Sequence, residues 1–148
     1  MKKILKYFLV VIATALLLHG IWEYWQCGIF YTMGGISSFE HTWLMASATS
    51  GDVGIAIGLF LILIFVNKDL EWVTGEWERK DYVIMILYSL FVSFYFEVNA
   101  LYEGRWGYSE NMPLFPTTNI GLLPVVQLLI LLPLGFYLSK IILKRIVK

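Results

Sequence analysis

Four apolar segments make up most of this chain, and three of them run out of hydrophobic residues before they are long enough to cross a membrane. A helix needs roughly 20 residues to span a hydrocarbon core of about 30 Å. The strictly apolar part of the second segment covers only residues 53–66, and the apolar part of the third covers only residues 82–96, with Ser89 and Ser93 already inside it. Helices that span must therefore take in Asp52 and Glu97, and the first segment must take in His19. Ionisable side chains inside a membrane are costly and point to a functional site.

The composition is that of an integral membrane protein. Hydrophobic residues make up 59% of the 148 residues and charged residues 15%, with a mean hydropathy of +0.72, whereas soluble domains are roughly 45–50% apolar. We expect an all-α, polytopic membrane protein in which a bundle of four transmembrane helices forms a single membrane domain over residues 1–148. The expected helices cover about residues 4–24, 43–66, 82–102 and 119–138.

The first segment also has features of a secretory signal. Lys2 and Lys3 precede its apolar run, and Ala13-Thr14-Ala15 has the small-x-small form of a cleavage site. That triplet lies within the apolar run rather than after it, however, and the residues that follow the run offer no small-residue site. We therefore favour a transmembrane helix.

The distribution of lysine and arginine predicts the topology. Short loops that carry these residues stay in the cytoplasm. Ten of the eleven lie at the two ends of the chain or between the second and third segments, and Arg105 falls elsewhere. We expect a multi-pass protein of the inner (plasma) membrane with both termini in the cytoplasm. The net charge of zero gives no indication of a nucleic-acid partner, and the basic ends suit contact with anionic membrane lipid.

The ionisable groups of the apolar segments fall at one depth. At 1.5 Å per residue, His19, Asp52 and Glu97 each lie about 21–22 Å from the cytoplasmic boundary, or about 8 Å below the outer one. Glu23 lies one helical turn beyond His19 on the same face, and Gln127 is the polar residue of the fourth segment. Four-helix bundles build sites from inward-facing side chains at one level. We therefore expect these five residues to line a ligand-binding pocket.

The outer loops are expected to cover this pocket. The segment over residues 103–118 contains two prolines and several aromatic residues, which indicate a folded lid. Arg105 and Trp106 lie in it, and a guanidinium group binds carboxylates bidentately and stacks on aromatic rings. Several glutamates are candidate partners for Arg105, so we add Arg105 and Trp106 to the expected binding residues. The loop over residues 26–40 is expected to lie along the outer interface.

Three functional interpretations are left open by these residues. The polar layer lines an outward-facing pocket for a small amphipathic molecule of cationic or lipid-like character; it only fixes helix packing in a non-catalytic assembly or partner protein; or His19 and Glu23 bind a metal together with Asp52 or Glu97. The spacing matches no established metal motif, so we assign no metal ligands. We also assign no cofactor and no catalytic residues.

Small residues in the second segment indicate close helix packing. Gly54-x-x-x-Gly58 matches the motif through which transmembrane helices approach one another. The motif fits a homo-oligomer and packing within one chain equally well, so it does not decide the oligomeric state.

Motifs spread over most of the chain resemble those of a family of small bacterial four-helix inner-membrane proteins. They are Trp22-Glu23, Ala48-Thr49-x-Gly51-Asp52, Gly104-Arg105-Trp106-x-Tyr108 followed by Met112-Pro113, and Gly121-Leu122-x-Pro124-x-x-Gln127. This resemblance implies the fold and the location, and it implies no activity.

A more distant resemblance is to the emopamil-binding-protein-like (EXPERA) membrane domains, which include sterol isomerases and amine-binding receptors. It rests on His19-x-x-x-Glu23 and on the acidic pair Glu97 and Glu103. The isomerases of that family carry an acid near the position of Ala46 and an Asn and a Trp in the last helix, where this chain has Gln127 and Ile130. The resemblance therefore implies a four-helix fold and does not extend to sterol isomerisation.

Overall fold

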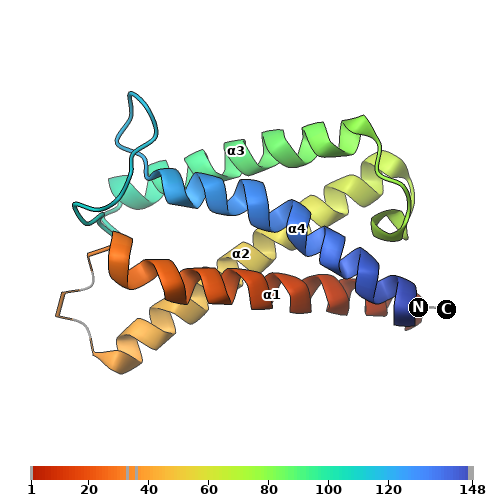
Figure 1. The fold of residues 1–148 in the computed structure, drawn as a ribbon, viewed down its shortest axis with the longest axis horizontal. Helices are drawn as coiled ribbons and strands as arrows, with labels where there is room; N and C mark the ends of the chain where they lie inside the picture. The colour runs from red at the N-terminus through yellow and green to blue at the C-terminus, as the bar shows by residue number, and fades with distance from the viewer. Residues whose placement is uncertain (1, 33, 36, 147–148) are drawn as a thin grey trace.

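The computed structural model describes residues 2–32, 34–35 and 37–146, and four long α-helices dominate it (Figure 1). They are α1 (Lys2–Phe30), α2 (Ser38–Asn67), α3 (Arg79–Tyr102) and α4 (Leu122–Ile146), and a short 3-10 helix, η1 (Trp72–Thr74), precedes α3. All four α-helices are long and apolar enough to cross a membrane. Within the described ranges there are two isolated β-bridges and no strand. The prediction of an all-α protein with four membrane-spanning helices is confirmed to this extent.

The helices extend beyond the predicted bounds. Helix α1 continues past residue 24 to Phe30, and α2 begins at Ser38 rather than at 43, so the prediction of a loop over residues 26–40 is wrong at both of its ends. Helix α4 covers Leu122–Ile146 instead of about residues 119–138. The predicted bounds followed hydropathy, whereas a helix ends where its backbone hydrogen bonds end.

Capping residues explain where α2 and α3 begin. Ser37 forms a capping box with Glu40 at the start of α2, and Glu78 forms one with Asp81 at the start of α3. In a capping box the two side chains satisfy backbone N–H groups that would otherwise lack an acceptor. Polar residues therefore start both helices before their apolar runs begin.

The four helices form a ring of neighbours in which α1 contacts α2 and α4, α4 contacts α3, and α3 contacts α2. Figure 1 shows that α2 and α3 lie close together near η1 and diverge towards the other end of the bundle. Where they meet, Tyr88 donates a hydrogen bond of 3.0 Å to the carbonyl of Ile55. A Cβ atom at Gly58 would lie 2.8 Å from the Tyr88 hydroxyl. Gly58 of the small-residue motif thus serves packing within the chain.

The apolar core occupies the end of the bundle where α2 and α3 converge. Phe60 and Phe136 are fully buried there, and Trp72 of η1 packs edge-on against Phe136 with ring centroids 5.6 Å apart. Trp72 also stacks on Trp77 at 5.4 Å. The start of α1 and the end of α4 lie at this end in Figure 1. The buried carboxylates and amides described below lie in the opposite half.

The segment between α3 and α4 is folded against the end of α1. Backbone amides donate from Ser109 to the Phe30 carbonyl and from Thr32 to the Gly107 carbonyl, each at 3.0 Å. Gly104 has a φ of 64°, a left-handed conformation that suits glycine. The segment therefore has a defined path over the open half of the bundle.

Candidate functional site

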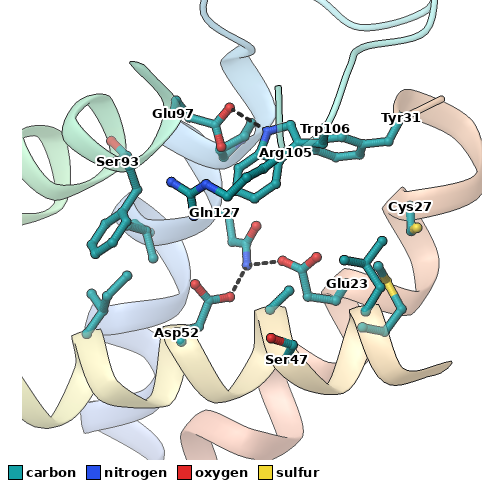
Figure 2. Close-up of a pocket in the computed structure, with 18 residues that line it drawn as sticks. Glu23, Cys27, Tyr31, Ser47, Asp52, Ser93, Glu97, Arg105, Trp106 and Gln127 are labelled. Carbon is teal, nitrogen blue, oxygen red and sulfur yellow. Dashed lines mark hydrogen bonds between the residues drawn. The ribbon is translucent and has the colours of Figure 1, made fainter. Parts of the chain in front are cut away.

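A cavity of about 510 Å³ lies in the half of the bundle where α2 and α3 diverge (Figure 2). All four helices and the segment between α3 and α4 contribute to its wall. Its apolar wall comes chiefly from Leu44, Met45, Ile55, Phe96 and Leu128. Its polar and charged side chains include Glu23, Ser47, Asp52, Ser93, Glu97, Arg105 and Gln127.

Three carboxylates from three different helices face this cavity. Glu23 comes from α1, Asp52 from α2 and Glu97 from α3. Glu23 and Glu97 are buried, and the side chain of Asp52 is 16% exposed. Each of them follows or precedes an apolar run, so the helices that bury the apolar residues also bring the acids to one level.

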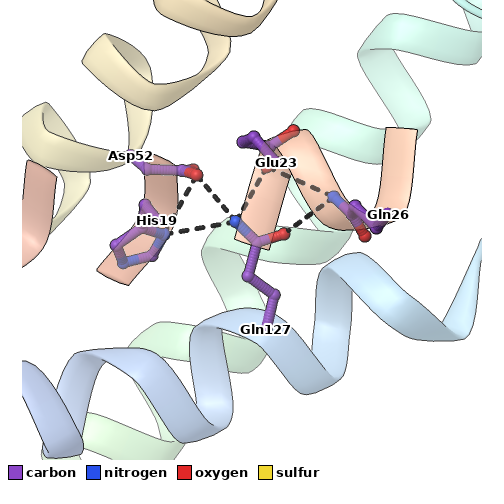
Figure 3. Close-up of polar contacts among 5 residues, drawn as sticks. All are labelled: His19, Glu23, Gln26, Asp52 and Gln127. Atoms are coloured by element: carbon purple, nitrogen blue, oxygen red, sulfur yellow. Dashed lines mark hydrogen bonds and ion pairs between the residues drawn. The ribbon is translucent and has the colours of Figure 1, made fainter. Parts of the chain in front are cut away.

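Gln127 joins two of these carboxylates across three helices (Figure 3). Its Nε2 atom on α4 lies 2.8 Å from Asp52 Oδ2 and 2.9 Å from Glu23 Oε1. Gln26 Nε2 lies 3.3 Å from both Gln127 Oε1 and Glu23 Oε1. The amide of Gln127 is therefore bonded through both its nitrogen and its oxygen.

The two hydrogens on the Gln127 amide nitrogen determine whether His19 Nδ1 donates or accepts a hydrogen bond. An amide nitrogen carries two hydrogens, and the two shortest contacts of Gln127 Nε2 use them for Glu23 and Asp52. Its third neighbour, His19 Nδ1 at 3.2 Å, then receives none. His19 Nδ1 also lies 3.0 Å from Asp52 Oδ2, so the satisfied arrangement has Nδ1–H donating to Asp52.

His19 lies behind the cavity rather than on its wall. The residue is 1% exposed, and it lines a separate space of about 10 Å³ together with Thr14, Ala56 and Phe136. Among the described residues its Nε2 atom has no hydrogen-bond partner. The sequence grouped His19 with the cavity residues because it shares their depth, but its ring supports Asp52 from the far side.

Glu97 is held by a different set of side chains. The hydroxyl group of Tyr108 donates a hydrogen bond to Glu97 Oε2, and Trp106 Nε1 lies 3.4 Å from the same oxygen. Tyr108 in turn accepts a hydrogen bond of 3.0 Å from the Gly121 amide. Burial raises the pKa of Tyr108, and its hydrogen bond to Glu97 raises it further, so Tyr108 stays a donor.

Arg105 lies on the wall of the cavity beside these residues. Its Nε atom lies 2.8 Å from Glu103 Oε2, and its guanidinium carbon lies 5.2 Å from the centre of the Trp106 ring. Glu103 is therefore its partner among the candidate glutamates. The Arg105 side chain is 41% exposed and stacks on Trp106 while lining the cavity.

Sequence reasoning missed two residues that position the carboxylates, Tyr108 and Gln26. Tyr108 belongs to the Gly104-Arg105-Trp106-x-Tyr108 motif, and Gln26 lies on the helical face of His19 and Glu23. Both signals were present, but neither indicates which carboxylate the side chain reaches. Cys27 also lines the cavity, and its sulfur lies 3.4 Å from His41 Nε2.

The described residues contain no group of three His, Cys, Asp or Glu side chains arranged to bind a metal ion. Comparison of the chain with models of protein families, with curated proteins and with solved structures found no match. The chemistry of the site is therefore inferred from the geometry of its own residues. An acidic cavity with apolar walls suits an ammonium group attached to an apolar body.

Proposed function

We propose that this is a multi-pass protein of the inner (plasma) membrane, with both termini in the cytoplasm, whose cavity binds a small amphipathic molecule that carries a positive charge. One observation carries the proposal: Glu23, Asp52 and Glu97 reach a single cavity of about 510 Å³ from three different helices. The volume is within the range of about 300–1,000 Å³ that small-molecule sites occupy. The cation on the cavity wall, Arg105, is already paired with Glu103.

Electrostatics favour a cationic ligand here. Acidic groups cost free energy inside a membrane, about 2.5–3.5 kcal/mol for an Asp at a helix centre. Two unit charges 4 Å apart attract by about 4 kcal/mol at an effective dielectric constant of 20. An ammonium group about 4 Å from one of these carboxylates therefore offsets much of the cost of burying that carboxylate. Its apolar body has Leu44, Ile55 and Phe96 as neighbours.

A second candidate function is supported by the Gln127 network. This network ties α1, α2 and α4 together, as expected of a polar layer that only fixes packing in an assembly or partner protein. Glu97 separates the two candidates because it takes no part in the network and is held by Tyr108 and Trp106. Packing of α1, α2 and α4 does not require a carboxylate at residue 97.

Ligand binding by the purified protein tests the proposal. Octylamine serves as the cationic probe and octanol as its neutral counterpart, with Trp106 beside the cavity as a fluorescent reporter. We expect octylamine to bind at least tenfold more tightly than octanol. Glu97→Gln should weaken octylamine binding at least tenfold and leave the melting temperature unchanged. The matched control is Glu110→Gln, an exposed glutamate of the neighbouring segment, which should bind as the wild type does.

Two results would favour the packing function instead. Equal affinity for octylamine and octanol would show that the positive charge of the ligand does not contribute to binding. If an Asp52→Asn, Glu97→Gln double variant binds octylamine as tightly as the wild type does, the two carboxylates do not contribute to binding. Either result would overturn the proposed ligand class.

A further inference from the structure

The cavity reaches the surface of the bundle between α2 and α3. Its wall includes Ser47 and Gly51 of α2, which are exposed, and Phe96 of α3, whose exposed fraction is 43%. Because the four helices form a ring of neighbours, α2 and α3 lie side by side on its perimeter. Figure 1 shows them diverging at this end. Inside a membrane, a gap between two adjacent helices faces lipid.

Small residues keep this gap open. Ser47, Ala48 and Gly51 line the cavity from one side of α2. A Cβ atom at Gly51 would have no atom within 4 Å, so the space beside it is unfilled. Larger residues at these positions would occupy the space that an acyl chain needs.

The charges at the cavity suit a ligand that carries both signs. Asp52 and Glu97 attract an ammonium group, whereas Arg105 at the edge repels one. Arg105 uses Nε for Glu103, which leaves its two terminal nitrogens for a second anion. A guanidinium group binds phosphate through two such nitrogens. Figure 2 shows Arg105 and Trp106 reaching over the cavity from the loop side, opposite Asp52.

We propose that the ligand is a phospholipid with an ammonium headgroup, which enters from the membrane through the gap between α2 and α3. Its ammonium group lies between Asp52 and Glu97, its phosphate binds Arg105, and an acyl chain leaves along Gly51. This inference rests on the proposed function and adds the route and the lipid class. The acids lie about 8 Å below the outer boundary in the proposed topology, so the headgroup of an outer-leaflet lipid moves inward by at least about that distance.

Four probes separate the contributions of the amine, the phosphate and the chains. They are dioctanoyl phosphatidylethanolamine, dioctanoyl phosphatidylglycerol, which has no amine, O-phosphoethanolamine, which has no chains, and octylamine, which has no phosphate. We expect the purified protein to bind dioctanoyl phosphatidylethanolamine at least tenfold more tightly than each of the other three. Arg105→Gln should remove the advantage of this lipid over octylamine.

Two glycines of α2 provide a matched test of the route. Gly51→Phe places a ring in the gap, whereas Gly54→Phe places one on the same helix away from the cavity wall; a Cβ atom at either position meets nothing within 4 Å. We expect Gly51→Phe to weaken binding of dioctanoyl phosphatidylethanolamine at least tenfold, while Gly54→Phe binds as the wild type does. Circular dichroism and the melting temperature report whether each variant folds.

The outcomes distinguish this inference from the proposed function. If octylamine binds through Glu97 but dioctanoyl phosphatidylethanolamine binds no better, the lipid class is overturned and the cationic pocket stands. Equal effects of Gly51→Phe and Gly54→Phe on lipid binding would overturn the route. Tight binding of O-phosphoethanolamine would identify a water-soluble ligand with the same headgroup. Failure of all four probes to bind would overturn the proposed function itself.

Discussion

Gln127 on α4 donates a hydrogen bond of 2.8 Å to Asp52 on α2, and the same nitrogen lies 2.9 Å from Glu23 on α1. One amide therefore satisfies acids on two other helices. Gln127 is buried. This side chain therefore links α4 to both α1 and α2.

Replacement of Gln127 by leucine is expected to destabilise the protein. Gln127→Leu keeps the approximate volume but removes one donor from each acid, so that Glu23 keeps only Gln26 and Asp52 only His19, at a cost of about 0.5–1.5 kcal/mol for each lost hydrogen bond. The melting temperature in detergent should fall clearly. Asn99→Leu is the control, because the Asn99 amide bonds the Tyr95 carbonyl of its own helix. An equal fall in both variants would argue against a special role of Gln127.

Tyr108→Phe is expected to loosen Glu97 and the segment after α3. The change removes the donor to Glu97 and the acceptor for the Gly121 amide, at a cost of about 1–3 kcal/mol. Limited proteolysis between residues 103 and 121 should become faster, and octylamine binding should weaken. Tyr102 is 91% exposed, so Tyr102→Phe should change neither measurement. Unchanged proteolysis of Tyr108→Phe would show that the segment is held by other contacts.

Gly58→Ala and Gly54→Ala should have opposite effects on stability. A Cβ atom at residue 58 would lie 2.8 Å from the Tyr88 hydroxyl, whereas one at residue 54 meets nothing within 4 Å. Moving Tyr88 breaks its bond to the Ile55 carbonyl, at a cost of about 0.5–1.5 kcal/mol. Gly54→Ala should be neutral or stabilise the helix by up to about 1 kcal/mol. In a Tyr88→Phe background the penalty of Gly58→Ala should disappear, which a double-mutant cycle of melting temperatures checks.

The contact between Lys3 and Glu71 predicts a pH effect at the end of the bundle where α1 starts and α4 ends. Lys3 Nζ lies 2.5 Å from Glu71 Oε1, and this hydrogen bond lowers the pKa of Glu71 below its ordinary value of 4.5. A lowered folded-state pKa contributes stability that is present above the unfolded-state value and is lost as the pH falls through the folded-state value. Hydrogen-exchange protection in the first turns of α1, after correction for the intrinsic pH dependence of exchange, should therefore fall on acidification below about pH 4.5.

Glu71→Gln should show the lower protection at all pH values and lose this acid-dependent step. Glu76→Gln, a change at another exposed acid of the same connection, should keep it. If Glu71→Gln retains the acid-dependent step, another group is responsible for it.

Cysteine labelling tests the proposed topology. With Cys27 replaced by alanine, single cysteines at Ser38 and Glu110 should react with impermeant thiol reagents added to intact cells, and one at Glu76 should react only after lysis. All three positions are exposed. Labelling of the cysteine at residue 76 from outside, or none at the other two, would reverse the topology inferred from the basic residues.

The sequence indicated the positions of some site residues better than those of others. Asp52 and Glu97 were predicted as cavity residues because they end apolar runs that are too short to span, and both line the cavity. His19 shares their depth but lies behind Asp52. Depth depends on position along a helix, whereas the direction of a side chain depends on how that helix is rotated and crossed by its neighbours.

Hydropathy and the spacing of ionisable residues determined the four helices and the level of their acids, because both are local properties of the chain. The tertiary structure decided that Gln127 bonds Glu23 and Asp52, that Tyr108 bonds Glu97, and that α2 and α3 diverge towards the end away from η1. These relationships join residues far apart in sequence. They are set by helix crossing and by the path of the segment after α3, which side-chain packing determines and local patterns do not encode.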